Sequence, residues 1–158
     1  ALSAGMSCPG DLMLMYGSTA FFIQKTTRLV PTDQLWSAIF LEPDTYVVAA
    51  GMATSGSLTR WFRDHFAQEA VAIEQAGGLN AYATLAQRAA GSPPGSKGLI
   101  VLPYFSGERT PLNDPDARGL IIGLTLAHTS DDLYRALLEG IGYGMRHNID
   151  TIVGALGK

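Results

Sequence analysis

Short apolar runs separated by turn residues fill the first third of the chain. Residues 12–16 (LMLMY) and 20–23 (AFFI) have only a Gly-Ser-Thr step between them, which predicts two buried strands joined by a tight hairpin. The β-rich run at residues 46–50 predicts a third strand, which ends at Gly51. Residues 31–43 are mixed in character and fit either a loop or a short irregular strand.

From residue 55 the apolar positions follow helical spacing. Leu58, Trp61, Phe62 and Phe66 predict an amphipathic helix from residue 55 to about residue 65 or beyond. Residues 68–75 and 79–90 predict two further helices, with two glycines between them. A Gly/Pro/Ser cluster at 91–96 predicts a loop, residues 99–102 a fourth buried strand, and residues 103–127 a long irregular segment.

A long helix is predicted at the C-terminal end, from residue 129 or 130 to about residue 153. Thr129 or Ser130 can cap it, and the two aspartates that follow suit the positive end of the helix dipole. Glycines at 140, 142 and 144 each weaken a free helix by about 1 kcal/mol, which suggests that another backbone approaches there. The order of strands, helices, strand and helix predicts an α/β fold in a single domain, 1–158.

Composition excludes several classes of protein. The chain is 47% hydrophobic with a net charge of -3, so disorder is not expected, and its basic residues are too scattered for nucleic-acid binding. No apolar run approaches the ~20 residues of a membrane span and no signal-peptide pattern is present, so a cytoplasmic protein is expected. The single Cys8 allows no intrachain disulfide, and no Cys/His spacing indicates a metal site.

Two glycine-containing turns are candidate phosphate sites. Gly17, Ser18 and Thr19 form a turn whose amides and hydroxyls can donate to phosphate oxygens. Residues 51–56 (GMATSG) lead from a strand into a helix, whose N-terminus suits an anion. Taken alone, the first turn is explained by an ordinary hairpin and the second by helix capping through Thr54 or Ser55. The presence of two such turns in one small domain makes phosphate binding a better interpretation than either turn does alone.

Other polar residues fit structural roles. Glu108 and Arg109 invite a catalytic role, but an ion pair that fixes a long loop is the better interpretation. His128 fits a capping or surface residue, and His65 and His147 fit helix ends, where a cation suits the dipole.

Residues 98–125 identify a family. Residues 98–111 read GLIVLPYFSGERTP, residues 113–119 read NDPDARG and residues 122–125 read IGLT, followed by ALLEG at 136–140. This sequence closely resembles that of the FGGY carbohydrate kinases. Their pattern is roughly GLxxLPYxxGERTPxxDPxARGxxxGL, followed by a helix that contains Ala-x-x-Glu-Gly. The resemblance extends to the RWFRD step at 60–64 and spans essentially the whole chain.

The resemblance implies a fold, a reaction and a set of site residues. The fold is one incomplete lobe of the ribonuclease H-like, actin-like ATPase architecture, with a mixed sheet flanked by helices. The reaction is transfer of the γ-phosphoryl of ATP, with Mg²⁺, to a sugar hydroxyl. Within the family, the sequence LPYxxGERTP looks closest to that of xylulose kinases. The implied nucleotide contacts are Gly17, Ser18, Thr19, Gly56 and Arg60, and Phe21 matches a position that some members place near the sugar.

The resemblance also implies missing parts. The catalytic Asp is expected upstream of Ala1, and the sugar-binding first domain and the adenine-binding Gly-rich motif lie outside this sequence. The isolated chain, a partial C-terminal domain cut at both ends, is therefore expected to be inactive. Two alternatives remain: a non-catalytic actin-like nucleotide-binding module, and an assembly fragment whose uncovered apolar surface forms a homodimer.

Overall fold

Four strands near the N-terminus form an antiparallel sheet. The structure is a computed structural model that describes residues 1–157. The strands are β1 (Leu12–Tyr16), β2 (Ala20–Thr26), β3 (Trp36–Ile39) and β4 (Tyr46–Met52), in the spatial order β1-β2-β4-β3. Every neighbouring pair is antiparallel, and β1 and β2 form the predicted hairpin. The short-strand alternative for residues 31–43 is therefore confirmed by β3.

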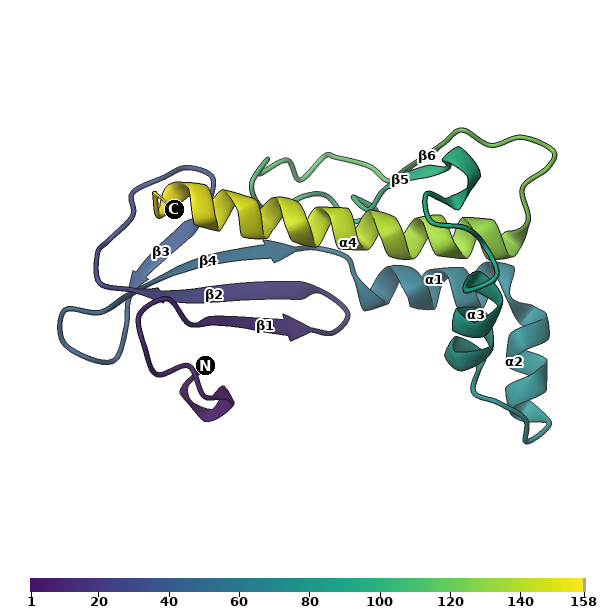
Figure 1. The fold of residues 1–158 in the computed structure, drawn as a ribbon, viewed down its shortest axis with the longest axis horizontal. Helices are drawn as coiled ribbons and strands as arrows, with labels where there is room; N and C mark the ends of the chain where they lie inside the picture. Colours follow the sequence, from purple (N-terminus) through teal and green to yellow (C-terminus); the bar gives the residue numbers. More distant parts are fainter. Residues whose placement is uncertain (158) are drawn as a thin grey trace.

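Four helices follow the sheet. They are α1 (Gly56–Phe66), α2 (Gln68–Gln75), α3 (Ala81–Ala89) and α4 (Ser130–Ala155), each close to its predicted bounds. In Figure 1 the long α4 lies along one face of the sheet, and α1, α2 and α3 gather near its N-terminal end. Within residues 1–157, no helix is both long and apolar enough to cross a bilayer.

One face of the sheet and the apolar sides of α1 and α4 make the main core. Phe22 on β2 and Phe62 on α1 are fully buried, as is Leu137 on α4. Because side chains alternate along a strand, the core face of β4 carries Val48, Ala50 and Met52. This packing fixes the end of β4 relative to the start of α1, which is where the predicted turns meet.

A second, two-stranded sheet lies on the other side of α4 (Figure 1). Its strands are β5 (Ile100–Leu102) and β6 (Leu120–Ile122), which pair antiparallel. Two single-turn 3-10 helices, Leu2–Ala4 and Ser96–Gly98, complete the elements. β6 lies in the segment predicted to be irregular, because three apolar residues between glycines are too short a run to recognise.

Two predictions of burial were wrong. β1 is an edge strand with four of its five residues exposed, since only β2 pairs with it. β5 buries only Val101, because its outward face has no partner among the described residues.

The glycines of α4 were predicted to mark close approach to another backbone. At Gly140 a Cβ atom would collide with the carbonyl oxygen of Val101, so the prediction is confirmed there. At Gly144 it would meet the side chains of Met52, at 2.7 Å, and Pro103, at 3.3 Å. A Cβ atom on Gly142 would have no atom within 4 Å, so the prediction is wrong for that residue.

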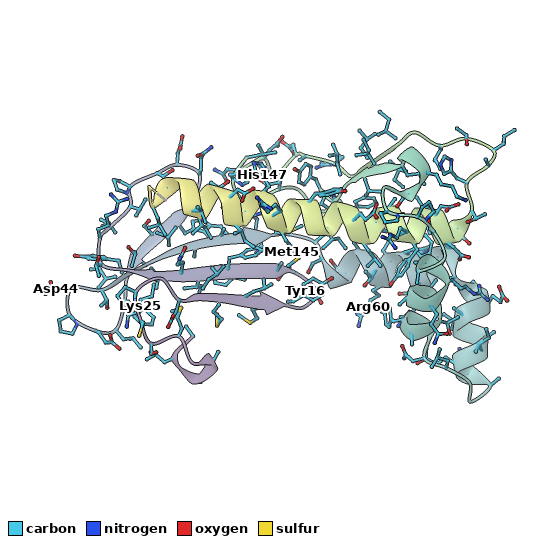
Figure 2. The ribbon with its side chains drawn as sticks, in the orientation of Figure 1. Tyr16, Lys25, Asp44, Arg60, Met145 and His147 are labelled. Carbon is cyan, nitrogen blue, oxygen red and sulfur yellow. The ribbon has the colours of Figure 1, made fainter. Side chains whose placement is uncertain are left out.

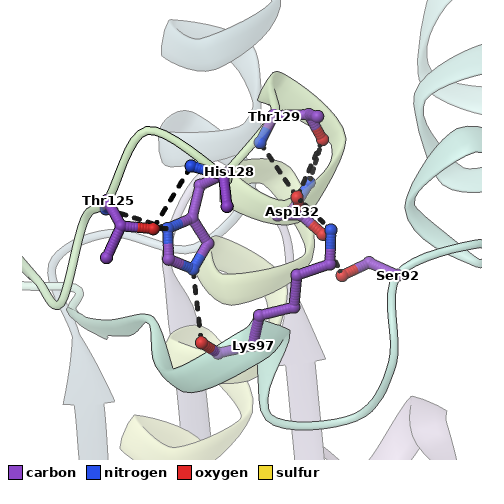
Figure 3. Close-up of polar contacts among 7 residues, drawn as sticks. Ser92, Lys97, Thr125, His128, Thr129 and Asp132 are labelled. Atoms are coloured by element: carbon purple, nitrogen blue, oxygen red, sulfur yellow. Dashed lines mark hydrogen bonds and ion pairs between the residues drawn. The ribbon is translucent and has the colours of Figure 1, made fainter.

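A buried carboxylate anchors the start of α4 (Figure 3). Thr129 caps the helix in a capping box with Asp132. Asp132 also accepts hydrogen bonds from Ser92 Oγ (2.7 Å) and Lys97 Nζ (2.9 Å), so it ties the loop before β5 to the helix. These bonds, that from Ser92 first, hold the pKa of Asp132 well below its usual range.

His128 lies beside this network and does not cap α4. Its Nδ1 accepts a hydrogen bond from the amide of Thr125 at 2.9 Å, and its Nε2 lies 3.3 Å from the carbonyl oxygen of Lys97 (Figure 3). The half-buried ring therefore stabilises the loop that enters the helix.

Candidate functional site

The two turns predicted as phosphate sites meet directly. The carbonyl oxygen of Gly17 accepts from the amide of Gly56 at 2.8 Å, and that of Ser18 accepts from the amides of Ser55 and Ser57 at 3.0 and 3.1 Å. The hydroxyls of Ser55 and Ser57 donate to the same two oxygens. We call this arrangement the turn junction, residues 17–19 and 55–57.

Gly56 is required for the close approach at the turn junction. A Cβ atom on it would lie 2.5 Å from the carbonyl oxygen of Gly17 and 3.2 Å from its carbonyl carbon. Real Cβ atoms do not approach a backbone oxygen that closely, so glycine alone fits. The sequence singled out Gly56, but no pattern in it indicates that its neighbour would be Gly17.

The first amides of α1 are already bound within the protein. Those of Ser55, Gly56 and Ser57 donate to the hairpin, and that of Leu58 donates to the carbonyl oxygen of Ser55. Because a helix has four such unpaired amides, all of them are accounted for. The amides around Gly56 were expected to donate to phosphate. In the structure they are not free to do so, because they already donate to oxygens of the hairpin.

Free donors remain on the hairpin side of the junction. Within residues 1–157, the amides and hydroxyls of Ser18 and Thr19 have no hydrogen-bond partner, and both residues are exposed. Arg60 lies one helical turn beyond Gly56 and is also exposed. Figure 2 shows Arg60 on the side of α1 away from α4 and Tyr16 at the end of β1. The arrangement offers hydrogen-bond donors and one cation, which suits an anionic group.

Phe21 lies on the opposite face of the sheet from the core. Its ring centroid is 6.0 Å from that of Trp36 on β3, and a Cβ on Gly51 would be 3.3 Å from both rings. Gly51 therefore lets the two rings close over the end of β4. Phe21 is half-buried and Trp36 is 45% exposed, so both rings are accessible to a ligand on this face of the sheet.

The Glu-Arg-Thr-Pro loop, residues 103–115, is fixed by Glu108 but not by an ion pair. Among residues 1–157, no ion pair joins Glu108 to Arg109, and Arg109 is exposed. Glu108 Oε2 instead accepts from the amides of Leu112 and Asn113, at 2.9 and 3.1 Å. Glu108 therefore fixes the loop, as predicted. The predicted partner, Arg109, was wrong, because backbone amides within the loop bind the carboxylate instead.

Burial raises the pKa of the Glu108 carboxyl, although the amides of Leu112 and Asn113 lower it. His147 lines the same small pocket as Glu108, together with Tyr104 and Asn148. It lies in the middle of α4 rather than at a helix end, so that prediction was wrong. His65 does lie in the last turn of α1, as predicted.

The described residues do not form a metal centre. No group of three or more His, Cys, Asp or Glu side chains within residues 1–157 is arranged to hold a metal ion.

Comparison with known proteins decides the family. The family model described as "FGGY family of carbohydrate kinases, C-terminal domain" matches residues 12–155. The chain belongs to this family. The α/β fold of an actin-like ATPase lobe, expected from the sequence, is confirmed by the match and by the solved structures that resemble this FGGY domain. The expected mixed sheet is not found in residues 1–157, because every pair of strands there is antiparallel.

Relatives of the FGGY domain are named as kinases of several sugars. The xylulose kinase of Rhodospirillum rubrum matches with a TM-score of 0.85 and 34% identity, over 98% of this chain and 29% of that one. The ribulokinase of Bacillus licheniformis is 31% identical over 94% of this chain and 28% of its own. The gluconokinase of Bacillus subtilis is 38% identical over 63% of this chain. The chain thus spans 20–28% of these two curated relatives.

Sequence reasoning missed the polar contacts that attach the Glu-Arg-Thr-Pro loop of the FGGY domain to β4 and α4. Thr110 bonds to the backbone of Gly51 and to Asn148, and Thr54 donates to the carbonyl oxygen of Pro103. Thr110 stood within the recognised motif, but no local pattern indicates its partners.

Proposed function

We propose that this domain holds the phosphates of ATP in a kinase that transfers the γ-phosphoryl group to a sugar hydroxyl. The observation that supports this proposal is the turn junction, where free hairpin donors lie beside a packed helix N-terminus. ATP supplies the phosphoryl group, and Mg²⁺ neutralises charge on the phosphates.

The residues of the turn junction have distinct proposed roles. Ser18 and Thr19 donate to phosphate oxygens through their amides and hydroxyls. Gly56 allows the hairpin to approach α1, and Gly17 supplies the carbonyl oxygen that accepts from the Gly56 amide. Arg60 adds a positive charge one turn along the helix. Fixed donors of this kind stabilise charge that develops in the transition state without having to reorganise.

The proposed acceptor is a ketose such as xylulose, with ribulose, gluconate and glycerol as the next candidates. The named relatives include xylulose, ribulose and gluconate kinases, so the family alone leaves these sugars open. Phe21 is proposed as an apolar contact for the sugar, because its half-buried ring lies on the accessible face of the sheet. The catalytic Asp expected before Ala1 and the cytoplasmic location stay predictions.

Sugar-dependent release of ADP from the longer kinase that carries this domain tests the reaction. Xylulose, ribulose, gluconate and glycerol are supplied separately with MgATP. Turnover with one of them is expected. If none of them gives turnover while MgADP still binds, the domain acts as the non-catalytic nucleotide-binding module considered above.

A matched pair of arginine variants tests the nucleotide contact. Arg60→Met is expected to raise the KM for MgATP several-fold, because it removes a positive charge near the phosphates, and to leave the KM for sugar unchanged. Arg146→Met is the control, since Arg146 is an exposed helix arginine whose partner is Asp150 in the next turn. Equal values of KM for MgATP in the two variants would remove Arg60 from the site.

A further inference from the structure

Thr110 lies at the centre of a buried chain of hydrogen bonds that links α4 to the end of β4. Thr110 and Asn148 are each only 2% exposed, and Gly51 is buried. Thr110 Oγ1 is 2.7 Å from the amide nitrogen of Gly51 and 2.7 Å from Asn148 Oδ1. Three polar groups that would be costly to bury alone are thereby satisfied.

The direction of each bond in this chain follows from Asn148. Its Nδ2 donates to the carbonyl oxygen of Gly144 at 3.0 Å, so its Oδ1 faces Thr110. The Thr110 hydroxyl has one hydrogen and two acceptors in reach, Asn148 Oδ1 at 2.7 Å and the carbonyl oxygen of Gly51 at 3.1 Å. The hydrogen goes to the nearer acceptor, Asn148, and the Thr110 oxygen accepts from the amide of Gly51. A residue without a hydroxyl would leave both the Gly51 amide and the Asn148 carbonyl unpaired.

The Thr110 hydroxyl accepts the hydrogen bond that a neighbouring strand would accept in a longer sheet. β3 pairs with β4 only at residues 46–49, so the amide of Gly51 extends past the end of β3. Gly51 is the last but one residue of β4, and α1 begins at Gly56. The bond to Thr110 therefore holds the segment that leads from the sheet into the turn junction.

The same loop makes a second attachment to that segment. Thr54, 4% exposed, donates to the carbonyl oxygen of Pro103. The loop itself is kept folded by Glu108, whose amide also donates to Asp114 at 2.8 Å. Residues 51–54 are thus held at two points by a loop that is fixed internally.

We propose that Thr110 is a positioning residue for nucleotide binding, acting through Gly51 on the turn junction. The identity of the ligand rests on the proposed function, whereas the hydrogen bonds of Thr110 are independent of that function. In this inference the Glu-Arg-Thr-Pro loop holds the segment between β4 and α1 in place, and the hydroxyl of Thr110 makes the essential contact.

The test compares three variants of the longer kinase. Thr110→Val keeps the shape of the side chain but removes the hydroxyl, and Thr110→Ser keeps the hydroxyl. Thr84→Val is the matched control, because the buried Thr84 hydroxyl on α3 has no hydrogen-bond partner among the described residues. The measurements are amide hydrogen exchange of residues 51–57 by mass spectrometry and the Kd for MgADP without sugar.

Thr110→Val is expected to speed exchange of residues 51–57 at least tenfold and to raise the Kd for MgADP at least fivefold. Thr110→Ser and Thr84→Val are expected to stay within twofold of wild type in both. The inference is overturned if Thr110→Val also stays within twofold, or if Thr84→Val changes both values as much. Should Thr110→Val not fold, Asn148→Ser removes the acceptor of the Thr110 hydroxyl and is expected to change both values in the same direction.

Failure of the proposed function gives a different result. Wild-type protein that binds MgADP but phosphorylates no sugar would refute the kinase proposal and leave the role of Thr110 standing. Wild-type protein that binds no MgADP would overturn both.

Discussion

Replacing Gly56 by alanine is expected to separate the two turns of the junction. The new Cβ would lie 2.5 Å from the carbonyl oxygen of Gly17, whereas carbon and oxygen atoms in contact need about 3.5 Å, so the hairpin must move by about 1 Å. The bonds from the amides of Ser55, Gly56 and Ser57, now 2.8–3.1 Å long, would then be stretched or lost.

The size of the effect follows from these bonds. Three backbone hydrogen bonds contribute about 1 kcal/mol each, so their loss costs about 3 kcal/mol. Alanine recovers about 1 kcal/mol through its higher helix propensity. The net expectation for Gly56→Ala is a loss of about 2 kcal/mol in the free energy of unfolding, or about 5 °C in Tm for a protein of this size.

Gly142→Ala is the control for this experiment. Gly142 lies within α4, and a Cβ there has no atom within 4 Å, so the same substitution gains helix propensity without a collision. It is expected to raise the free energy of unfolding by about 1 kcal/mol. The two alanine variants should therefore differ by about 3 kcal/mol, although the chemical change is identical.

Urea unfolding followed by circular dichroism measures both variants, and calorimetry with MgADP tests the proposed nucleotide site in each. Nucleotide affinity should fall in Gly56→Ala and stay unchanged in Gly142→Ala. If Gly56→Ala is as stable as Gly142→Ala, the hairpin and α1 are not in the contact described, and the turn junction is refuted.

Three further predictions concern α4. Gly140→Ala would place a Cβ against the carbonyl of Val101 and 3.0 Å from its Cβ, and should lower the free energy of unfolding by about 1–2 kcal/mol, measured in urea. Thr129→Ala removes the helix cap and should cost about 1 kcal/mol in the same assay. The pKa of Asp132 is lowered in the folded state, so its stabilising contribution is complete above the unfolded pKa of about 4 and is lost as the pH falls below that value. Asp132→Asn should therefore reduce the loss of Tm between pH 5 and pH 2.5, and an unchanged loss would contradict this.

The sequence predicted local elements well because their signals are local. The helix at Gln68–Gln75 follows from its composition and the glycines after it, and the hairpin of β1 and β2 follows from two apolar runs around the Gly-Ser-Thr turn. Which faces are buried depended on strand order, which no local pattern contains, and so the exposure of β1 was not foreseen. β6 consists of only three residues and is recognisable only through its pairing with β5.

The candidate site shows the same division. The motif at residues 98–125 identified the family, and the resemblance then implied nucleotide contacts at Gly17 and Gly56, which local patterns alone explained as an ordinary turn and a helix start. The hydrogen bond between Gly17 and Gly56 joins residues 39 positions apart in sequence, and such a contact leaves no mark in a single sequence. Thr110 and Asn148, 38 positions apart, were missed for the same reason.

The position of α4 has a consequence for biosynthesis. The sheet face carrying Phe22 and Val48 is covered mainly by this helix, which begins about 80 residues after β4 ends. At ribosomal rates of about 5–20 residues per second, the apolar face stays uncovered for on the order of ten seconds after the sheet strands have been synthesised. An uncovered face and the open edge of β1 together favour association between nascent chains, so chaperones that shield apolar surfaces should raise the soluble yield of this domain.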